Sequence, residues 1–380
     1  MFWHESRPSG AIRRLRTVAV LSFALITMRM GATHADAAVS HLFSFTHPAM
    51  GTTYELYLYA ATEAQANSEA EKAFEVVDDV EELLSNYRPQ SELSRINEEA
   101  YGGTVTTDPE TFEFLEDSLA WSERSDGAFD ITVGQLMKAW GFFRSTGHVP
   151  SETEVRTVLA KTGWRNVKLD RATRSVRFAV PGVELDPGGI GKGFAVDKVM
   201  EVLRLDGIGS ALLSAGSSTI YALGAPPGKA GWQVNVPDPR RADATLAVVL
   251  LRDTSLSTAS CAEKHFVLQG HLYCHIMDPR LGRPVEGRLQ ATVITPIATD
   301  GDALSNVMFV DDAKARERVM ASLPAGDSAL VFSGVPQEDR GKSAPGVQIA
   351  GCDSYDWPGV LPDICHAVRM SGAVTKERHK

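Results

Sequence analysis

The stretch that most constrains the fold of this chain runs from Glu184 to Gly216, where glycines surround one lysine ahead of an amphipathic segment. Val183 to Leu185 predicts the end of an apolar strand, and glycines at 188, 189, 191 and 193 then surround Lys192. Apolar residues follow at the spacing of one buried helix face: Val196, Val199, Met200 and Leu203. Gly207 stands where a glycine often ends a helix. The expected order is strand, glycine loop, helix and strand.

Such a glycine loop has two physical interpretations. It can leave backbone N–H groups free at a helix N-terminus, where they and Lys192 favour a phosphate group. Alternatively, the glycines only let two backbones approach closely. Two common nucleotide loops do not fit, because Gly193 follows the lysine instead of Ser or Thr, and the glycine spacing is not GxGxxG. Asp186 favours the phosphate interpretation, since a carboxylate beside a phosphate often binds a divalent cation or a nucleotide.

Length and charge limit the classes of protein that this chain can belong to. Its 380 residues are enough for one large domain or two ordinary ones. Apolar residues make up 43% of the chain, which is typical of a globular protein. The formal net charge of −10 argues against a basic surface for nucleic acid, so no nucleic-acid partner is expected.

The first 37 residues have the features of a secretory signal peptide. Arginines at positions 7, 13, 14 and 16 precede an apolar run over 18–28, and residues 35–37 (Ala-Asp-Ala) fit a cleavage site. The run is short for a membrane span, and an uncleaved anchor is the alternative. No cysteine lies near the cleavage region, so the protein is not expected to be a lipoprotein. We expect a signal peptide over 1–37, a periplasmic domain over 38–370 and a polar tail over 371–380.

The four cysteines, at positions 261, 274, 352 and 365, form two pairs with equal separation. They lack CxxC spacing, so a zinc site is not expected. In an exported chain they can oxidise, and Cys261–Cys274 with Cys352–Cys365 is the simplest of three pairings. A Cys352–Cys365 disulfide near the C-terminus is favoured, and buried free thiols are the alternative.

The rest of the chain mixes long helix patterns with strands of alternating polarity. Helices are expected at about 64–85, after Asp108-Pro109, and from Asp302 to Val310, with a hairpin over 167–178. Further strands are expected at 53–59, 210–214, 244–251, 255–260 and 289–296. This mixture favours an α+β (mixed α/β) fold, with antiparallel-rich sheets flanked by helices, over a doubly wound parallel sheet.

Polar residues in the second half suggest a site, although each has a structural alternative. His275 precedes an Asp-Pro pair that could simply cap a turn. Asp302, Ser305 and Asn306 bring three oxygen-bearing side chains onto one helical turn. Oxygen ligands suit Mg²⁺ better than zinc, but the same residues could belong to an N-capped surface helix.

In this order the motifs resemble those of the flavin transferases of the ApbE family, which move FMN from FAD onto a protein. The resemblance covers about 47–310 and implies an ApbE-like fold. The matching motifs are Met50-Gly51-Thr52, Ser85-Asn86-Tyr87 with Ser91 to Asn97, Gly127 to Asp130, Asp186 to Asp197, Trp232 with Asp238-Pro239-Arg240, His275 to Gly282, and the segment from Asp302.

The resemblance also implies the residues of the site. Those that would contact FAD are Met50, Tyr87, Ala128, Phe129, Asp130, Asp186, Lys192 and Ile276. Those that would surround Mg²⁺ are Gly189 (through its carbonyl), Asp302, Ser305 and Asn306. By the same likeness, the chain would transfer FMN to a Ser or Thr hydroxyl of an acceptor protein and release AMP. The acceptor would be a subunit of an exported or membrane redox complex.

The chemistry of such a transfer agrees with these residue types. Attack on the FMN-side phosphorus develops negative charge, which a metal ion near Asp302 and the charge of Lys192 can stabilise. The acceptor hydroxyl also needs a proton acceptor, for which His275 or an acid near the metal is a candidate. Two other functions stay open: an exported FAD-binding protein without transfer activity, and a pyrophosphatase that splits FAD into FMN and AMP.

Three of the motifs depart from those of the family. Ser217 replaces the second glycine of a Gly-Gly pair, which adds a Cβ and restricts φ. Ala259 and Ser260 replace the last two residues of a Thr-Ser-Gly motif. Asn306 replaces a threonine of the metal helix, so it keeps an oxygen ligand but lacks the hydroxyl.

Overall fold

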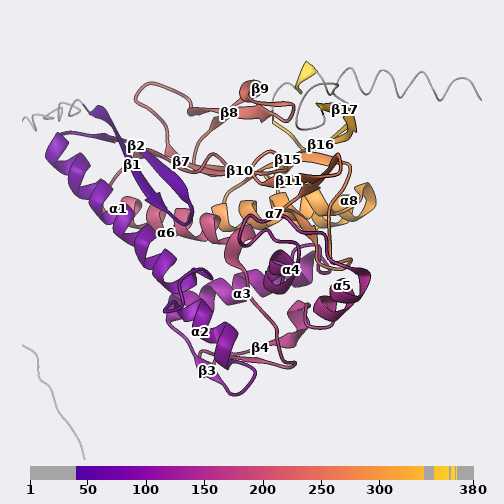
Figure 1. Ribbon diagram of the computed structural model, residues 1–380. Helices are drawn as coiled ribbons and strands as arrows, with labels where there is room; N and C mark the ends of the chain where they lie inside the picture. The colour runs from indigo at the N-terminus through magenta and orange to yellow at the C-terminus, as the bar shows by residue number, and fades with distance from the viewer. Residues whose placement is uncertain (1–39, 338–345, 359–360, 364, 366–380) are drawn as a thin grey trace, which may run out of the picture. The chain divides into compact units, whose positions relative to one another are not determined.

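A computed structural model describes residues 40–337, 346–358, 361–363 and 365, and the signal peptide and polar tail expected at 1–37 and 371–380 lie outside them. Its centre is an antiparallel sheet of eight strands in the order β1-β2-β6-β7-β10-β15-β16-β17 (Figure 1). These strands are β1 (His41–Ala49), β2 (Thr52–Ala60), β6 (Ser210–Ala215), β7 (Thr219–Gly224), β10 (Thr254–Ser260), β15 (Arg288–Thr295), β16 (Ser328–Gln337) and β17 (Gly346–Tyr355). Every neighbouring pair is antiparallel, which confirms the α+β prediction.

Three long helices, α1 (Glu63–Leu84), α6 (Gly191–Leu205) and α7 (Ala298–Val310), cover one face of this sheet (Figure 1). The four predicted apolar residues of α6 are fully buried, because they pack with α1 and with strands β2 and β6. Helix α7 is buried on nearly all sides, polar residues included. Its position under the middle strands places Thr299, Asp302 and Ser305 in the protein interior.

Smaller elements surround this frame. The other helices are α2 (Glu92–Glu99), α3 (Pro109–Arg124), α4 (Gly134–Ala139), α5 (Glu152–Leu159) and α8 (Ala313–Ala321). A three-stranded sheet contains β3 (Val105–Thr106), β5 (Ser175–Phe178) and β4 (Val167–Asp170), of which β4 and β5 are the predicted hairpin. Two short pairs contain β11 (His265–Leu268) with β12 (His271–Cys274), and β13 (Met277–Asp278) with β14 (Arg283–Pro284).

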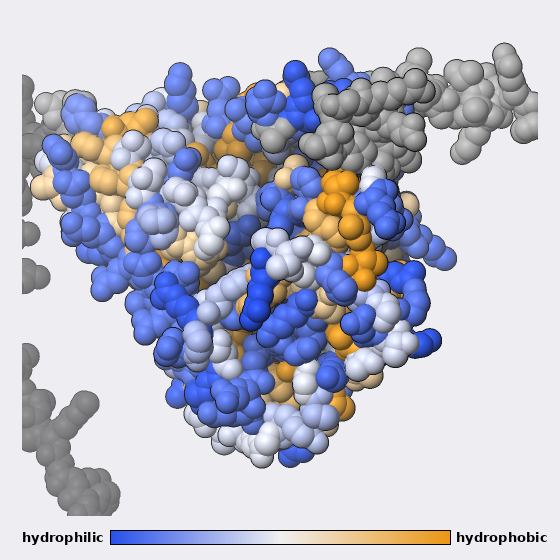
Figure 2. All heavy atoms as spheres, viewed as in Figure 1, coloured by the Kyte–Doolittle hydropathy of each residue, from blue (hydrophilic) through white to orange (hydrophobic). Residues whose placement is uncertain are grey.

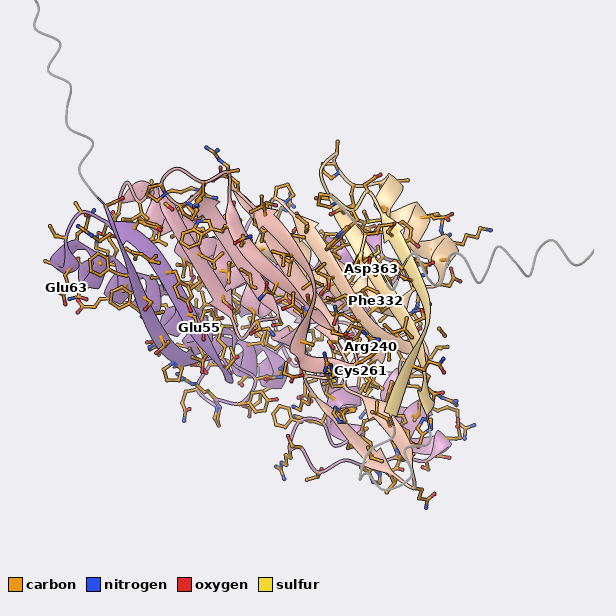
Figure 3. The ribbon with its side chains drawn as sticks, turned by 90° about the horizontal axis from the view of Figure 1, so that it is seen from above. Glu55, Glu63, Arg240, Cys261, Phe332 and Asp363 are labelled. Carbon is orange, nitrogen blue, oxygen red and sulfur yellow. A yellow bond between two sulfur atoms is a disulfide. The ribbon has the colours of Figure 1, made fainter. Side chains whose placement is uncertain are left out.

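A two-stranded ribbon lies over the other face of the large sheet (Figure 1). Strands β8 (Trp232–Asp238) and β9 (Arg241–Leu251) form it, and their inward residues pack on those of β10, β15 and β16. The view from above shows the large sheet with its strands side by side (Figure 3). Figure 2 shows that hydrophilic residues cover most of one face of the molecule, which agrees with the charge composition.

One predicted strand is absent from the described part of the chain. Val183 to Leu185 is not part of a strand and pairs with no neighbouring strand. Instead, the backbone N–H of Leu185 donates to the side-chain oxygen of Asn97 at 2.7 Å, and the amide nitrogen of Asn97 donates to the carbonyl of Leu185 at 3.1 Å. The next residue, Asp186, donates its N–H to the carbonyl of Ile131. The prediction was wrong because a side-chain amide supplies the bonds that a partner strand would make.

The start of α7 also differs from the prediction. The helix begins at Ala298, so Asp302 lies in its second turn and is only 5% exposed. The N-terminal N–H groups of Ala298 and Thr299 donate to the carboxylate of Asp197 on α6, at 2.9 and 2.7 Å. A cap from another helix leaves no local sequence signal, which explains why the predicted start at Asp302 was wrong.

Both predicted disulfides are present, Cys261–Cys274 and Cys352–Cys365, each with a Cα–Cα distance of 5.1 Å. They are typical of proteins that fold in an oxidising compartment. Over residues 40–337 and the short described segments that follow, no helix combines the length and the apolar character needed to cross a bilayer.

Candidate functional site

A pocket of about 850 Å³ brings the predicted site residues together, and its volume is in the range of cofactor sites. Eleven of the thirteen predicted residues line it: Met50, Tyr87, Ala128, Phe129, Asp130, Asp186, Gly189, Lys192, His275, Ile276 and Asn306. The other two, Asp302 and Ser305, are buried beside it in α7, with 5% and 1% exposure. Segments more than 250 residues apart in the chain therefore meet at one site.

Met50 enters the pocket from the turn between β1 and β2. Met50 and Gly51 both have positive φ, 50° and 71°, and they join a pair of strands whose last residues are directly opposite. Two positive φ values are typical of a two-residue type I′ hairpin, whose twist matches that of the strands. A methionine in this conformation is strained, and the hydroxyl of buried Tyr54 donates to its sulfur at 3.0 Å. The turn thus holds the thioether at the pocket.

Aromatic rings form one side of the pocket. The rings of Tyr87 and Phe143 are stacked, with centroids 4.4 Å apart and planes 9° from parallel, and Tyr87 is 61% exposed. Beside them, Asn86 donates to one carboxylate oxygen of Asp186 and the backbone of Gly188 donates to the other, both at 2.9 Å. The pKa of Asp186 is raised because the surrounding protein desolvates its carboxyl group, and these two hydrogen bonds oppose the increase.

The Ala128-Phe129-Asp130 segment lies at the wall of the pocket, but the carboxylate of Asp130 is bonded within the protein. It accepts hydrogen bonds from the backbone and hydroxyl of Thr132 and from the backbone of Trp164, at 2.7–2.9 Å. Burial raises the pKa of Asp130 and these bonds oppose the increase. The carboxylate therefore holds two loops together at the pocket wall.

The N-terminus of α6 is closed by an acid from α7. The backbone N–H of Gly193 donates to the Asp302 carboxylate at 3.1 Å, and Lys192 adds a further backbone bond. This corrects the expectation that the glycine loop leaves these N–H groups free for a phosphate. A Cβ on Gly193 would lie 2.7 Å from the carbonyl carbon of Ala298. Close backbone approach is therefore the role of this glycine.

The two helices cap each other. Asp197 of α6 bonds the first N–H groups of α7, while Asp302 of α7 bonds those of α6. Asp302 also accepts from the hydroxyl of Thr219 on β7 at 3.3 Å. Burial raises the pKa of Asp302, and the positive charge of Lys192 is the largest opposing effect. This pair of caps fixes α6, α7 and the central strands relative to one another.

Lys192 extends from the first turn of α6 into the pocket, where its ammonium group donates to the hydroxyl of Ser218. Ser218 ends the turn between β6 and β7, which also contains Gly216 and Ser217 at φ values of 62° and 64°. Ser217 thus adopts a left-handed conformation that its family motif assigns to glycine, at a cost of about 1–2 kcal/mol. The turn therefore keeps its left-handed backbone conformation with serine at position 217.

His275 is held as a neutral base. Its Nδ1 lies 2.8 Å from the carbonyl oxygen of Lys264, which can only accept, so Nδ1 carries the proton and Nε2 keeps a lone pair. Burial lowers the pKa of His275 to about 4, and the charges of Lys192, Lys264 and His265 act in the same direction. The imidazole is therefore unprotonated at neutral pH. No described residue forms a hydrogen bond with Nε2.

The Asp-Pro pair that follows His275 has a structural role. Asp278 accepts from the backbone N–H of Arg280 and from its guanidinium group, all at 2.9–3.0 Å. Arg280 in turn donates to buried Asp311 at the end of α7, at 2.9 Å. The turn-cap interpretation is thus correct for Asp278, and the bridge joins the His275 segment to α7.

The residues proposed to hold a metal form an oxygen-rich group with one carboxylate. The amide nitrogen of Asn306 donates to the carbonyl oxygens of Gly189 (3.3 Å) and Asp302 (3.0 Å), and the Ser305 hydroxyl donates to the latter at 2.8 Å. Within the described ranges, no three His, Cys, Asp or Glu residues gather as metal ligands. Carbonyl, hydroxyl and carboxylate oxygens suit Mg²⁺. The group fits such an ion once the Asn306 amide turns to present its oxygen.

Comparison with known proteins decides the family. Residues 50–331 match the model of the ApbE family. The chain belongs to this family. It is 32% identical over 275 residues to an FAD:protein FMN transferase of Klebsiella pneumoniae, and the match covers 71% of this chain and 83% of that protein. The protein is accordingly a transferase.

Solved structures of the family have the same fold. The ApbE protein of Thermotoga maritima superposes with a TM-score of 0.70 at 31% identity, covering 77% of this chain and 94% of that one. The apo form of the flavinyl transferase ApbE of Pseudomonas stutzeri superposes with a TM-score of 0.69 at 26% identity. The match covers 82% of this chain and 95% of that one. These likenesses confirm the predicted fold and membership of the family.

Several residues that line the pocket were not predicted from the sequence, and Phe143, Glu263 and Lys264 are three of them. The pKa of Glu263 is raised, mainly because the surrounding protein desolvates its carboxyl group. The positive charge of Lys192 opposes this increase, and the negative charge of Asp302 adds to it. All three residues lie in loops without a motif of their own. Only the proximity of Glu263 and Lys264 to Cys261 could have drawn attention to them.

Proposed function

We propose that this protein transfers FMN from FAD to a Ser or Thr hydroxyl of an acceptor protein and releases AMP, with Mg²⁺ as the required ion. The observation that carries the proposal is the convergence of eleven motif residues on one pocket, in a chain that belongs to the ApbE family. The predicted FAD contacts and Lys192 share this pocket with a neutral histidine. The acceptor is proposed to be a subunit of an exported or membrane redox complex.

His275 is proposed as the proton acceptor of the reaction. Its Nε2 takes the proton of the acceptor hydroxyl while that oxygen attacks the FMN-side phosphorus of FAD. The bond from that phosphorus to the bridging oxygen breaks, and AMP leaves with this oxygen and its electron pair. Lys192 stabilises the charge that develops on the phosphate oxygens. The proton on His275 then returns to solvent, so atoms and charges balance.

Gly189, Asp302, Ser305 and Asn306 are proposed to hold Mg²⁺. When bound, the ion would neutralise charge on the pyrophosphate. Asp302 has two functions in this proposal, because its carboxylate caps α6 and offers the formal negative charge of the ligand group. An Asp302→Ala variant should therefore lose both metal-dependent transfer and helix capping.

One assay distinguishes transfer from the two alternative functions. The purified chain is incubated with FAD, Mg²⁺ and an acceptor domain from an exported redox subunit, and the products are separated on a denaturing gel. Covalent flavin fluorescence on the acceptor supports the proposal. Bound FAD without products would indicate a flavin-binding protein, and free FMN with AMP would indicate a pyrophosphatase.

We further propose export to the periplasm, cleavage of the signal peptide near Ala37 and a transferase domain over 38–370. Two disulfides support an oxidising compartment. The intact mass of protein recovered from the periplasm tests this proposal. A mass that begins near Ala38 is expected, and a mature protein that retains Met1 would contradict cleavage.

A further inference from the structure

The Cys261–Cys274 disulfide closes the base of a hairpin next to the pocket. Cys261 directly follows β10, and Cys274 ends β12, whose pairing with β11 places it opposite His265. Both cysteines are buried, at 9% and 1% exposure. The bond therefore joins the end of a central sheet strand to the end of the hairpin.

Three pocket residues lie beside this bond in the sequence. Glu263 and Lys264 follow Cys261, and His275 follows Cys274 directly. The backbone N–H and the ring Nδ1 of His275 both bond to the carbonyl of Lys264, at 3.1 and 2.8 Å. The disulfide thus spans the two short segments that these hydrogen bonds connect.

Backbone bonds attach these two segments to neighbouring parts of the chain, because Cys261 donates to the carbonyl of Leu289 at 3.2 Å and Val285 donates to that of Ile276 at 2.9 Å. The side chains of Glu263 and Lys264 form no hydrogen bond or ion pair with any described residue. The distal part of the hairpin has its own contacts, because Phe266 stacks on Tyr273 at 4.9 Å and Tyr273 lies 5.7 Å from Trp140. The far end of the hairpin can therefore stay attached without the disulfide, which supplies the covalent link across its base.

We propose that the Cys261–Cys274 disulfide is a positioning element of the transfer site that keeps Glu263, Lys264 and the His275 imidazole in the pocket wall. This inference rests on the proposed function of the pocket. Reduction by a dithiol would break the S–S bond, transfer two electrons and two protons to the cysteines, and convert the reductant into its own disulfide. The base of the hairpin would then be free to move while the sheet stays intact.

The chain contains a matched control for this bond. Cys352–Cys365 has the same separation of 13 residues and the same Cα–Cα distance of 5.1 Å. Cys352 lies opposite Phe332 at the edge of the sheet, and neither cysteine lines the pocket. Figure 3 shows Cys261 apart from Phe332 and Asp363, which are near the second bond. Loss of either bond removes one cross-link of equal loop length, but only one of them adjoins the site.

The test compares the full chain with Cys261→Ala/Cys274→Ala and Cys352→Ala/Cys365→Ala variants. FMN transfer is measured at saturating FAD and Mg²⁺, and the ¹⁵N spectrum of the histidine rings reports the Nδ1–H bond of His275. A misplacement of about 1 Å can cost on the order of 100-fold in rate. We expect the first variant to lose transfer at least tenfold together with the Nδ1–H signal, while the second keeps both within about twofold.

A loss of less than tenfold in the first variant, or equal losses in both, would overturn the proposal. If the first variant does not fold, the Cys352→Ala/Cys365→Ala protein retains only the bond of interest. Dithiothreitol should then abolish its transfer reversibly, and unchanged transfer after complete reduction would refute the role. If the wild-type chain transfers no FMN, the proposed function fails, but the ring spectrum still tests whether the disulfide holds His275.

Discussion

At the residue scale, the chemistry of the pocket depends on how the protein environment changes ordinary side chains. The carbonyl of Lys264 selects one tautomer of His275, and burial keeps the ring neutral. The same kind of desolvation raises the pKa of Glu263 and of Asp302. The site thus combines a base that stays unprotonated with acids that take up protons more readily than in water.

The first prediction concerns pH. Because the pKa of His275 is lowered to about 4, the ring loses its capacity to accept a proton only as the pH falls through about 4. The acid limb of kcat/KM should therefore lie near pH 4, well below the value of about 6.5 for a solvated histidine. His271→Gln, at the exposed tip of the hairpin, should leave this limb in place. A limb near 6.5 would mean that His275 is solvated in the working enzyme.

The second prediction concerns Lys192. A charged hydrogen bond contributes about 1.5–3 kcal/mol, so Lys192→Ala should weaken FAD binding by about one to two orders of magnitude. Titration calorimetry measures the effect. Lys198→Ala is the control, because Lys198 is on the same helix, pairs with Glu113 and does not line the pocket. Equal FAD affinity in all three proteins would show that Lys192 has only a structural role.

The third prediction concerns Asn306. Its amide nitrogen donates to the carbonyl oxygen of Gly189, a proposed ligand of Mg²⁺, so Asn306→Thr should free this oxygen and add a hydroxyl oxygen. The Mg²⁺ concentration that gives half-maximal transfer should fall by roughly tenfold, as in other changes around metal ligands. The fold should tolerate the change, since the difference in helix propensity is a few tenths of a kcal/mol. An unchanged Mg²⁺ dependence would place residue 306 outside the metal shell.

At the scale of elements, the pairing of α6 and α7 organises the site. Each helix supplies the aspartate that caps the other, and Gly193 lets their backbones approach. The close contact places Asn306 beside Gly189 and positions Lys192 at the pocket. A change that separates these helices should therefore affect stability and activity together.

Gly193→Ala tests this pairing. The added Cβ would overlap the backbone of Ala298, which cannot move like a flexible side chain, so the free energy of unfolding should fall by about 2 kcal/mol or more. Gly209→Ala is the matched control, because no atom lies within 4 Å of the position that its added Cβ would occupy. Urea denaturation measures both variants. Equal stability of Gly193→Ala and wild type would contradict the close contact.

At the scale of the whole molecule, one antiparallel sheet carries helices on one face and a ribbon on the other. The pocket is formed by turns and helix ends from Met50 to Val310, and none of the described residues of β16 and β17 lines it. The edge of the sheet is therefore expected to affect stability more than catalysis.

The last prediction concerns the Cys352–Cys365 bond at this edge of the sheet. A cross-link that closes a loop of this length stabilises a protein by about 3 kcal/mol, mainly through the unfolded chain. Cys352→Ala/Cys365→Ala should lower the free energy of unfolding by about 2–4 kcal/mol in urea titrations. FMN transfer below the unfolding range should stay within about twofold of wild type. A parallel loss of transfer would connect this edge to the site.

The sequence alone predicted the fold class, both disulfides and eleven of the residues that line the pocket, because these features have local or motif-level signals. Alternating polarity specifies strands, and helical spacing specified the buried face of α6. The predicted site residues belong to motifs whose members stand close together in the chain. Eleven of these thirteen residues line one pocket.

Only the tertiary structure decided how the glycine loop is used. The Asp302 cap on α6 and the Asp197 cap on α7 join residues about 100 positions apart, and such bonds have no local pattern. For the same reason the start of α7 and the absence of a strand at Val183 to Leu185 were not predicted. The neutral state of His275 likewise depends on desolvation and on the Lys264 carbonyl, which exist only once distant segments have packed together.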